Sequence, residues 1–268
     1  DVYKRQGGHR EHSPAYHLML LKSFASLVDE GIIDDETIIE RIRLANSNLA
    51  WMIAPDGKIL QFGDTESGVV PEQAFVFEDT FADYVLSKGT RGTAPAADLH
   101  VLKKSGYVFV RPSGTPVEKQ SYLAYMCAFH SRAHKHADDH TFVWWENGVE
   151  ILIDPGRFGY LDRLPAKSPD RLKGFFYSRP ERQYVERTFA HNCLEIDGED
   201  IERRSRKPFG SGVVSAQRKD SGEFEIIGES PNARYSHRRT LRYMPAEYLE
   251  VEDSIVAVSY THLRAHET

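Results

Sequence analysis

The strongest constraint on the fold is a two-residue turn signal, Asn147-Gly148, between two short runs rich in β-branched and aromatic residues. The runs are Thr141 to Trp145 and Val149 to Ile153, and Asp154-Pro155-Gly156 follows the second run. Asn-Gly between such runs favours a type I′ turn, whose twist matches that of two paired strands. We therefore predict a β-hairpin that ends at Asp154.

Residues able to bind a metal ion stand at the open end of this hairpin. His134 and His136 are two residues apart, so both rings leave an extended chain on one face, and Asp154 returns at the end of the second strand. His191 lies just before another strand-like run. Two imidazoles and a carboxylate suit zinc, whereas solvated polar residues at a strand end are the competing interpretation.

The alternation of side chains along the hairpin adds a condition to this metal site. A two-residue turn sets Asp154 opposite Thr141, which has the wrong alternation for His136. The metal site therefore requires a bulge or a loop within residues 137–140.

Composition narrows the class of protein. The chain has 268 residues, 40% hydrophobic and 28% charged, which is typical of a globular protein with one or two domains. No apolar run is long enough to span a bilayer, so we expect no membrane partner. The formal charge of −6 argues against general nucleic-acid binding and leaves any anionic ligand to a local basic patch. For Cys127 and Cys193, which lie in apolar strand-like settings, we expect buried thiols.

The two ends of the chain are set apart from the fold. Residues 1–6 and 258–268 resemble the translated sequencing-adapter tails that occur at the ends of metagenomic reading frames. We exclude both tails, with His262 and His266, from the fold argument, and we expect natural sequence to be missing on both sides.

The first part of the chain has helical spacing. Apolar residues between Tyr16 and Val28, and again between Ile38 and Met52, recur at the spacing of one helix face. They predict two antiparallel helices, the second capped by Asp34 or Asp35. Residues 80–86 predict a third helix, and residues 90–97 a linker.

From Asp98 onward the pattern changes to short runs between turn residues, which is typical of an antiparallel sandwich. We predict a long functional loop over residues 161–187 and a solvated basic loop over residues 202–207. Besides the hairpin, the predicted strands are 99–103, 106–111, 121–130, 192–196, 212–216, 223–227, 239–243 and 248–251. The predicted fold class is thus α+β.

Four stretches resemble the heparinase II/III-like polysaccharide lyases and occur in that family's order. They are Arg10-Glu11-His12-Ser13-Pro14-Ala15-Tyr16-His17, Gln61-Phe62-Gly63-Asp64, His134-Lys135-His136-Ala137-Asp138-Asp139 with Asp154-Pro155-Gly156-Arg157, and Ala190-His191-Asn192. The resemblance implies the last helices of an (α/α) toroid over residues 7–97 and an antiparallel β-sandwich over residues 98–257. The active site is then expected in the cleft between them.

The resemblance also implies roles for single residues. The zinc ligands of the family correspond to His136, Asp154 and His191, its catalytic tyrosine to Tyr16, and a histidine of the cleft to His134. The zinc is expected to be structural, joining the hairpin to the loop of His191. An asparagine or histidine that the family takes from earlier toroid helices has no counterpart here, so we expect this chain alone to be incomplete as an enzyme. A secreted or periplasmic location is implied as well.

The function implied is β-elimination on a uronate-containing acidic polysaccharide, such as a glycosaminoglycan or alginate. Such a lyase removes the proton α to the uronate carboxylate, and a tyrosine base, which normally titrates at about pH 10, needs cations near it. Two alternatives remain: a zinc-dependent hydrolase with water at an open metal position, and a carbohydrate-binding sandwich without catalysis. Product chemistry separates the three.

Overall fold

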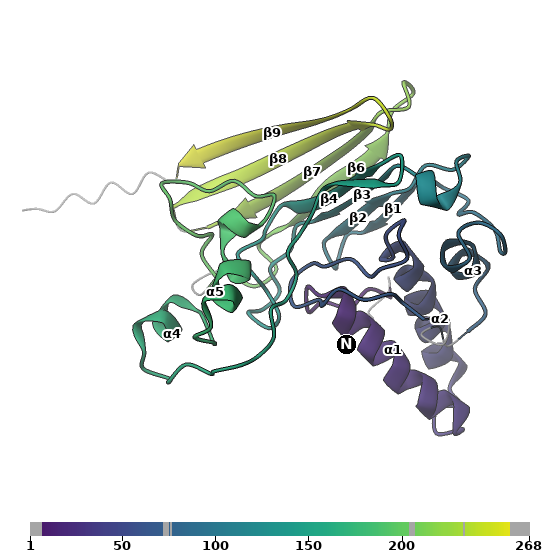
Figure 1. Ribbon diagram of the computed structural model, residues 1–268, viewed down its shortest axis with the longest axis horizontal. Coiled ribbons are helices and arrows are strands. Elements are labelled where there is room, and N and C mark those ends of the chain that lie inside the picture. Colours follow the sequence, from purple (N-terminus) through teal and green to yellow (C-terminus); the bar gives the residue numbers. More distant parts are fainter. Residues whose placement is uncertain (1–6, 72–74, 76, 204–206, 233, 258–268) are drawn as a thin grey trace, which may run out of the picture.

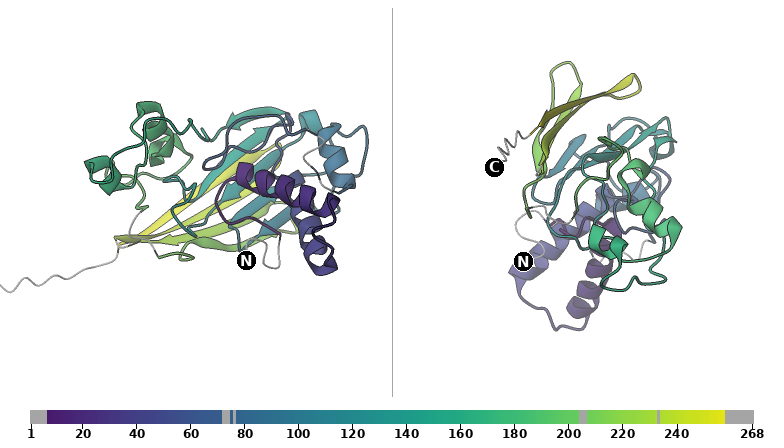
Figure 2. Two further views of the ribbon diagram at one scale, coloured as in Figure 1. Left: turned by 90° about the horizontal axis from the view of Figure 1, so that it is seen from below. Right: turned by 90° about the vertical axis from the view of Figure 1, so that its left-hand side faces the viewer.

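The computed structural model describes residues 7–71, 75, 77–203, 207–232 and 234–257. Two antiparallel sheets lie face to face, and the three N-terminal helices cover the outer face of the first sheet (Figures 1 and 2). The predicted adapter tails, residues 1–6 and 258–268, lie outside the described residues. The predicted class, an α+β fold with an antiparallel β-sandwich, is confirmed.

The three predicted helices are present. They are α1 (Pro14–Asp29), α2 (Glu36–Trp51) and α3 (Thr80–Leu86). The carboxylates of Asp35 and Asp79 each accept hydrogen bonds from two backbone N–H groups in the first turn of α2 and α3. These caps satisfy donors that have no partner within the helix, so the starts of α2 and α3 are set by local sequence. Among the described helices, none is both long enough and apolar enough to cross a membrane.

The first sheet has five strands in the order β1-β2-β3-β4-β5. Its central strands β2 and β3 are buried on both faces, because their sequences, YVFV and YLAYM, are apolar throughout rather than alternating. A register shift between Trp144 and Trp145 bends the predicted hairpin. The five strands are β1 (Leu99–Leu102), β2 (Tyr107–Val110), β3 (Tyr122–Met126), β4 (Thr141–Glu146) and β5 (Val149–Leu152).

The second sheet has four strands that pair in chain order. Strand β8 alternates between buried and less buried side chains over most of its length, as expected for a sheet with one face on the core and one face in solvent. The four strands are β6 (Gly212–Arg218), β7 (Phe224–Pro231), β8 (Tyr235–Met244) and β9 (Tyr248–Ala257).

The predicted strand over residues 192–196 is wrong. Within it only Ile196 pairs, through an isolated bridge to Glu199. The Asn192 side chain instead donates to the backbone carbonyls of Phe142 and Ile153, at 2.8 Å each. These two bonds tie the segment across the hairpin, so it does not run on as a strand.

Two hydrophobic cores lie on opposite faces of the first sheet. One core joins residues such as Val108, Leu123 and Phe142 to residues of the second sheet, including Ile226 and Leu241. The other core joins the opposite face of the same strands to α1, α2 and α3. The helices and the first sheet therefore share one continuous core, which fixes the position of α1 relative to the loops of the sandwich.

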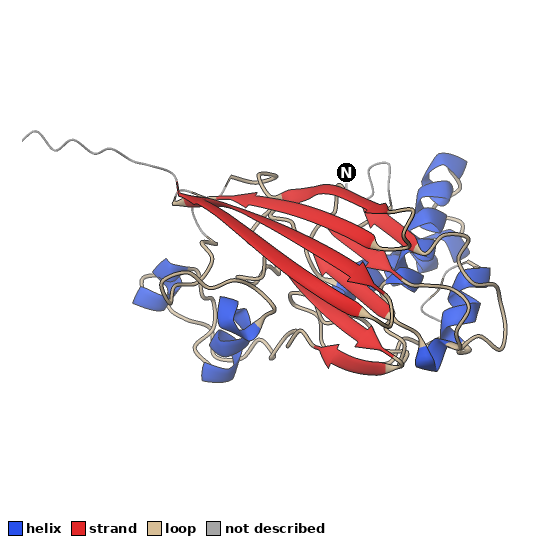
Figure 3. Ribbon diagram, turned by 90° about the horizontal axis from the view of Figure 1, so that it is seen from above, coloured by secondary structure: helices blue, strands red, loops and turns tan. Residues whose placement is uncertain are grey.

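The predicted long loop, residues 161–187, contains two short helices, α4 (Pro169–Lys173) and α5 (Pro180–Glu186), at one end of the sheets (Figure 3). Each helix begins with proline, whose fixed φ suits the first helical position. The expected solvated loop over residues 202–207 is wrong at Arg203, which is buried and donates to Glu186 and to the backbone carbonyl of Lys135. Residues 204–206 of that run lie outside the described residues.

Candidate functional site

The loop between β3 and β4 carries most of the histidines singled out by the sequence. It leaves the sheet after Met126 and returns at Thr141, and residues 137–140 form an irregular loop with a turn, as the alternation required. His134 and His140 adopt the left-handed backbone region, with φ of 53° and 70°. That region is costly for residues other than glycine, so tertiary contacts hold these two positions.

A glycine brings Asp64 against this loop. Gly63 has φ of 51°, and a Cβ atom there would lie 2.6 Å from the backbone oxygens of both His12 and His134. Only glycine fits such an approach. The next residue, Asp64, donates its backbone N–H to the His134 carbonyl at 3.2 Å.

The Asp64 carboxylate is the hub of the site. One of its oxygens lies 3.1 Å from His134 Nδ1 and accepts the Tyr160 hydroxyl at 2.8 Å. The other lies 3.0 Å from His136 Nε2 and 2.5 Å from Arg182 Nη2. Asp64 is 3% exposed, so this carboxylate is held by four side chains almost without water.

These contacts shift two pKa values in opposite directions. Burial by itself would raise the pKa of Asp64, but hydrogen bonds from His134 and His136 and the charge of Arg182 outweigh it and lower that pKa well below its usual range. Burial, followed by the negative charge of Asp64, raises the pKa of Tyr160 far above its usual value. Tyr160 therefore stays protonated and donates its hydroxyl proton.

Tyr16, in the first turn of α1, faces His134 across the junction between the helices and the sandwich. The two rings stack with centroids 3.6 Å apart and planes 25° from parallel. The Tyr16 hydroxyl lies 3.1 Å from the hydroxyl of Tyr160. On its other side, His134 Nε2 lies 3.5 Å from a Glu11 carboxylate oxygen. The predicted catalytic pair is thus brought into direct contact.

An open pocket of about 320 Å³ surrounds this pair. Its volume is in the range of ligand sites. Four basic and two acidic side chains line it, and the buried Asp138 and Asp139 pair with Lys135 from behind, so four cations face four carboxylates. Its lining is Tyr16, Asp64, Arg132, Ala133, His134, Lys135, Tyr160, Phe176, Tyr177, Arg182, Glu186 and Arg203.

Behind the pocket, a closed group of three residues has the chemistry of a metal site. One potential ligand atom from each of His136, Asp138 and His191 lies within 4.8 Å of the other two. All three residues are buried, and His136 Nδ1, Asp138 Oδ2 and His191 Nε2 have no hydrogen-bond partner. Such buried polar atoms are costly unless something binds them.

The second polar atom of each of these side chains contacts another side chain. His136 Nε2 faces Asp64, and the Asp138 Oδ1 atom faces the buried ammonium of Lys135. Metal-binding histidines usually donate their second N–H to a carboxylate in this way. The donor set of two imidazoles and one carboxylate therefore fits zinc.

Asp154 does not belong to this group of three potential ligands. It contacts the other ring nitrogen of His191 instead. Its Oδ2 atom lies 2.9 Å from His191 Nδ1 and accepts the Thr141 hydroxyl at 2.8 Å, while Oδ1 accepts the Gly156 N–H. Burial would raise the pKa of Asp154, but His191 outweighs it and lowers that pKa. The structure brings Asp154 together with His191 but puts Asp138 beside the two histidines, so a direct bond from Asp154 to a metal stays a prediction.

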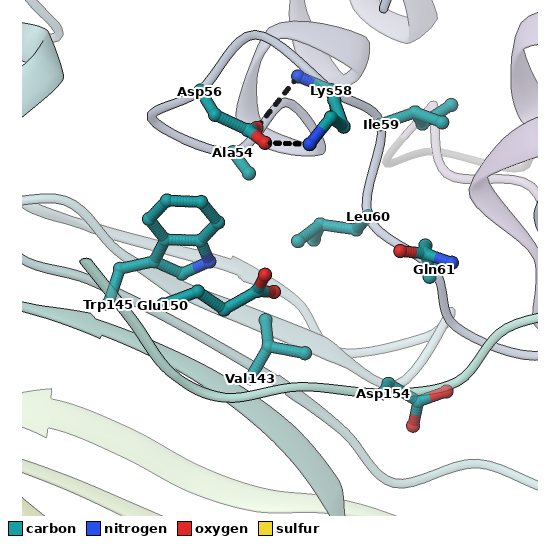
Figure 4. A pocket seen from close by; sticks show the side chains of 10 residues that line it. All are labelled: Ala54, Asp56, Lys58, Ile59, Leu60, Gln61, Val143, Trp145, Glu150 and Asp154. Carbon is teal, nitrogen blue, oxygen red and sulfur yellow. Dashed lines mark hydrogen bonds and ion pairs between the residues drawn. The ribbon is translucent and has the colours of Figure 1, made fainter. Parts of the chain in front are cut away.

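A second hollow near Asp154 is too small for a sugar (Figure 4). Its volume is about 30 Å³, enough for one or two water molecules. Lys58 and Asp56 pair at 2.7 Å on its far wall, and the oxygens of Asp154 are already engaged by Thr141, Gly156 and His191. This hollow belongs to the packing of the hairpin.

Four residues of the site were not assigned from the sequence: Asp64, Asp138, Tyr160 and Arg182. Asp64 and Asp138 stood inside the quoted motifs, so a signal existed, although no role was attached to them. Tyr160 and Arg182 lie in or beside the segment that was predicted to be a loop, where no spacing rule connects them to Tyr16. Only the folded chain brings them to Asp64.

Comparison with solved structures finds this architecture in larger proteins. The heparinase III product of the BT4657 gene matches at a TM-score of 0.77 and 20% identity over 96% of this chain and 39% of that chain. A structure described as heparinase III matches at 0.76 and 17%, over 96% of this chain and 41% of that one. Heparan sulfate lyase HepC from Pedobacter heparinus matches at 0.74 and 17%, over 96% and 40%. This chain therefore spans about two fifths of the length of these structures.

Sequence comparison adds the family. A search of curated proteins found no match to this chain. The sequence profile of the family described as Heparinase II/III-like, C-terminal, matches residues 94–263, which is more than half of the chain. That range includes the loop between β3 and β4 with its histidines, the hairpin, and Asp138, Asp154 and His191. The chain thus belongs to the heparinase II/III-like C-terminal family, a family of polysaccharide lyases.

Proposed function

We propose that this chain forms part of a lyase that cleaves a uronate-containing acidic polysaccharide by β-elimination. The observation that carries the proposal is the stacking of Tyr16 on His134 at the wall of an open pocket that is also lined by four basic side chains. A base, a group held beside it and room for a sugar ring are the requirements of this reaction.

The reaction needs one group that takes a proton and returns it. The base removes the C5 proton α to the carboxylate, and the electron pair of that C–H bond forms the C4=C5 double bond. The glycosidic C4–O bond breaks, and its electron pair leaves with the departing sugar oxygen, which then takes a proton. We assign both transfers to the Tyr16 phenolic oxygen: as the tyrosinate it takes the C5 proton, and as the resulting phenol it gives that proton to the departing sugar oxygen, which restores the tyrosinate.

The neighbours of Tyr16 support this assignment. Tyr160 donates to Asp64 and lies 3.1 Å from the Tyr16 hydroxyl, so it orients that hydroxyl within the pocket. His134 is fixed between Asp64 and Glu11 and braces the tyrosine ring from one face. Fixed geometry of this kind lowers the entropic barrier to proton transfer.

The charge of the pocket suits a uronate. Lys135, Arg182 and Arg203 are held by the carboxylates of Asp138, Asp139, Asp64 and Glu186, whereas Arg132, also in the lining, is exposed. A substrate carboxylate entering this pocket would meet the exposed guanidinium of Arg132, a local positive group on a chain that is negative as a whole. The proposed partner is therefore an acidic polysaccharide, with a secreted or periplasmic location as part of the proposal.

We further propose that zinc binds at His136 and His191, with Asp138 or Asp154 as the carboxylate. Bound zinc would supply a structural cross-link between the histidine loop and the loop of His191. A hydrolytic zinc needs an open position for water, but these side chains are buried, and none of them lines the open pocket. Burial therefore favours a structural metal over a zinc-dependent hydrolase.

The test is product chemistry in the complete enzyme. Digestion of glycosaminoglycan or alginate should yield an unsaturated uronate that absorbs in the ultraviolet, and Tyr16→Phe should abolish this product. New reducing ends without ultraviolet absorbance would indicate a hydrolase. Binding without any product would indicate a carbohydrate-binding module, and both results would contradict the proposal.

A further inference from the structure

A second open hollow adjoins the pocket of Tyr16. Its volume is about 500 Å³, and it shares Arg132, Ala133 and Phe176 with the first pocket. Its remaining lining comes from the segment of α4: Ala166, Arg171, Leu172 and Gly174. The two hollows are therefore adjacent, with Phe176 lining both, and together they are called the groove below.

Two guanidinium groups in this groove have no carboxylate partner among the described residues. Arg132 is exposed and forms no ion pair with a described residue. Arg171 lies with its Cζ atom 4.1 Å from the centroid of the Phe176 ring and makes a 3.5 Å contact to the Phe176 carbonyl. By contrast Arg182 and Arg203, deeper in the first pocket, are held by Asp64 and Glu186.

The position of Arg171 is prepared by local structure. Ser168 caps α4 through the Arg171 backbone N–H, and Gly174 ends the helix at φ of 108°. A guanidinium stacked on an aromatic ring keeps its N–H edge free, and that planar edge matches the two oxygens of a carboxylate or sulfate. Stacking on Phe176 therefore presents Arg171 for bidentate binding at little further entropic cost.

We propose that Arg132 and Arg171 form a subsite for an anionic substituent, sulfate or carboxylate, on the sugar ring next to the ring held at Tyr16. This inference rests on the proposed function, because it takes the groove to hold a polysaccharide. Phe176 offers an apolar face to the sugar rings where the two hollows meet, and the two arginines select for charge on the neighbouring ring. The segment of α4 and α5 then sets which polysaccharide binds.

The experiment measures binding of defined oligosaccharides to this chain by calorimetry. The probes are an N-sulfated heparan hexasaccharide, its de-N-sulfated, N-acetylated counterpart, and an alginate hexasaccharide without sulfate. The variants are Arg132→Gln and Arg171→Gln, with Lys173→Gln on the same short helix, outside both hollows, as the matched control. Arg171→Lys keeps the charge but removes the planar fork, and melting curves check that each variant folds.

We expect Arg132→Gln and Arg171→Gln each to weaken binding by about tenfold, and Lys173→Gln to leave it unchanged. Arg171→Lys should recover only part of the loss. A loss confined to the sulfated probe assigns the subsite to sulfate, whereas an equal loss for all three probes assigns it to the uronate carboxylate.

Two results would overturn the subsite. One is binding by the wild type that neither arginine variant changes, which leaves the lyase proposal intact. The other is a wild type that binds none of the three probes at millimolar concentration. Elimination by the complete enzyme is assayed separately, so a failed subsite is distinguished from a failed lyase.

Discussion

His134 and His140 lie on the same loop, yet their surroundings differ completely. The His134 side chain is 25% exposed in the open pocket, stacked on Tyr16. His140 is fully buried between the sheets, where Tyr125 and Ser230 lie 2.6 and 2.8 Å from its two ring nitrogens. Under the proposed function His134 serves the reaction in the open pocket, whereas His140 joins the two sheets, and solvent access makes the difference.

On the buried side of this loop, one arginine of the second sheet binds the backbone of two loops. Arg239 makes two bonds to Asp253, at 2.8 and 2.7 Å, and donates to the backbone carbonyls of His140 and Asn192, at 2.9 and 2.5 Å. Those carbonyls belong to the two loops that carry His136 and His191. The second sheet thereby fixes the two loops that carry the candidate metal ligands His136, Asp138 and His191, although it contributes no ligand itself.

The largest expected effect on stability comes from removing the hydrogen bonds of Arg239. Arg239→Met leaves Asp253 with His237 alone and removes a donor from the backbone carbonyls of His140 and Asn192, so the free energy of unfolding should fall by about 3 kcal/mol or more. Urea unfolding at pH 7 measures it. The control is Arg242→Met on the same strand, which loses partly exposed ion pairs to Glu250 and Glu252 and should cost at most about 1 kcal/mol. If the two variants lose the same free energy of unfolding, the bonds of Arg239 stabilise the fold no more than the surface ion pairs of Arg242.

The second largest effect on stability should come from the candidate metal ligands. His136→Ala should lose bound zinc and lower the free energy of unfolding by about 3 kcal/mol, because Asp64 loses a buried partner and the shared ligand disappears. Metal analysis and a melting curve measure the two losses. His134→Ala, two residues away on the open side, should retain zinc. Retention of a full zinc equivalent by His136→Ala would rule out this ligand.

Acid should weaken the fold through buried histidines on the helical side. Burial lowers the pKa of His17 and His100 to about 4. The unfolded chain takes up these protons near the ordinary value of about 6.5, so stability is complete above that pH and falls as the pH drops from about 6.5 to 4. Each residue should contribute on the order of 1–2 kcal/mol of loss between pH 7 and 5. Urea unfolding of wild type and His100→Gln at both values tests this, and an unchanged pH dependence in the variant would contradict it.

The smallest expected effect on stability is that of Tyr16→Phe, on the open side. Phenylalanine keeps the ring that stacks on His134 and loses one part-buried hydroxyl, so the free energy of unfolding should change by less than about 1 kcal/mol. Elimination by the complete enzyme should nevertheless fall at least about 100-fold. Near-normal turnover, or a melting temperature as low as that of His136→Ala, would make Tyr16 a packing residue.

Local signals account for most of the fold that could be predicted. The Asn147-Gly148 hairpin, the capped starts of α2 and α3 and the shift to strands near Leu99 each depend on a few neighbouring residues. The errors arose where a distant contact overruled the local pattern. Residues 192–196 looked like a strand until the Asn192 side chain bound two carbonyls of the hairpin, and Arg203 looked solvated until it met Glu186.

The sequence by itself determined the elements and the chemical types of the site: imidazoles on one loop, a carboxylate at the end of the hairpin and a tyrosine at the start of a helix. Backbone geometry and short-range spacing carry that information. Only the tertiary structure decided that Asp64 would be the hub and that Asp138 would stand beside His136 and His191 with Asp154 behind them. Those choices depend on contacts between residues far apart in the chain, such as Asp64 and Arg182, and on burial, which makes an unpaired polar atom costly.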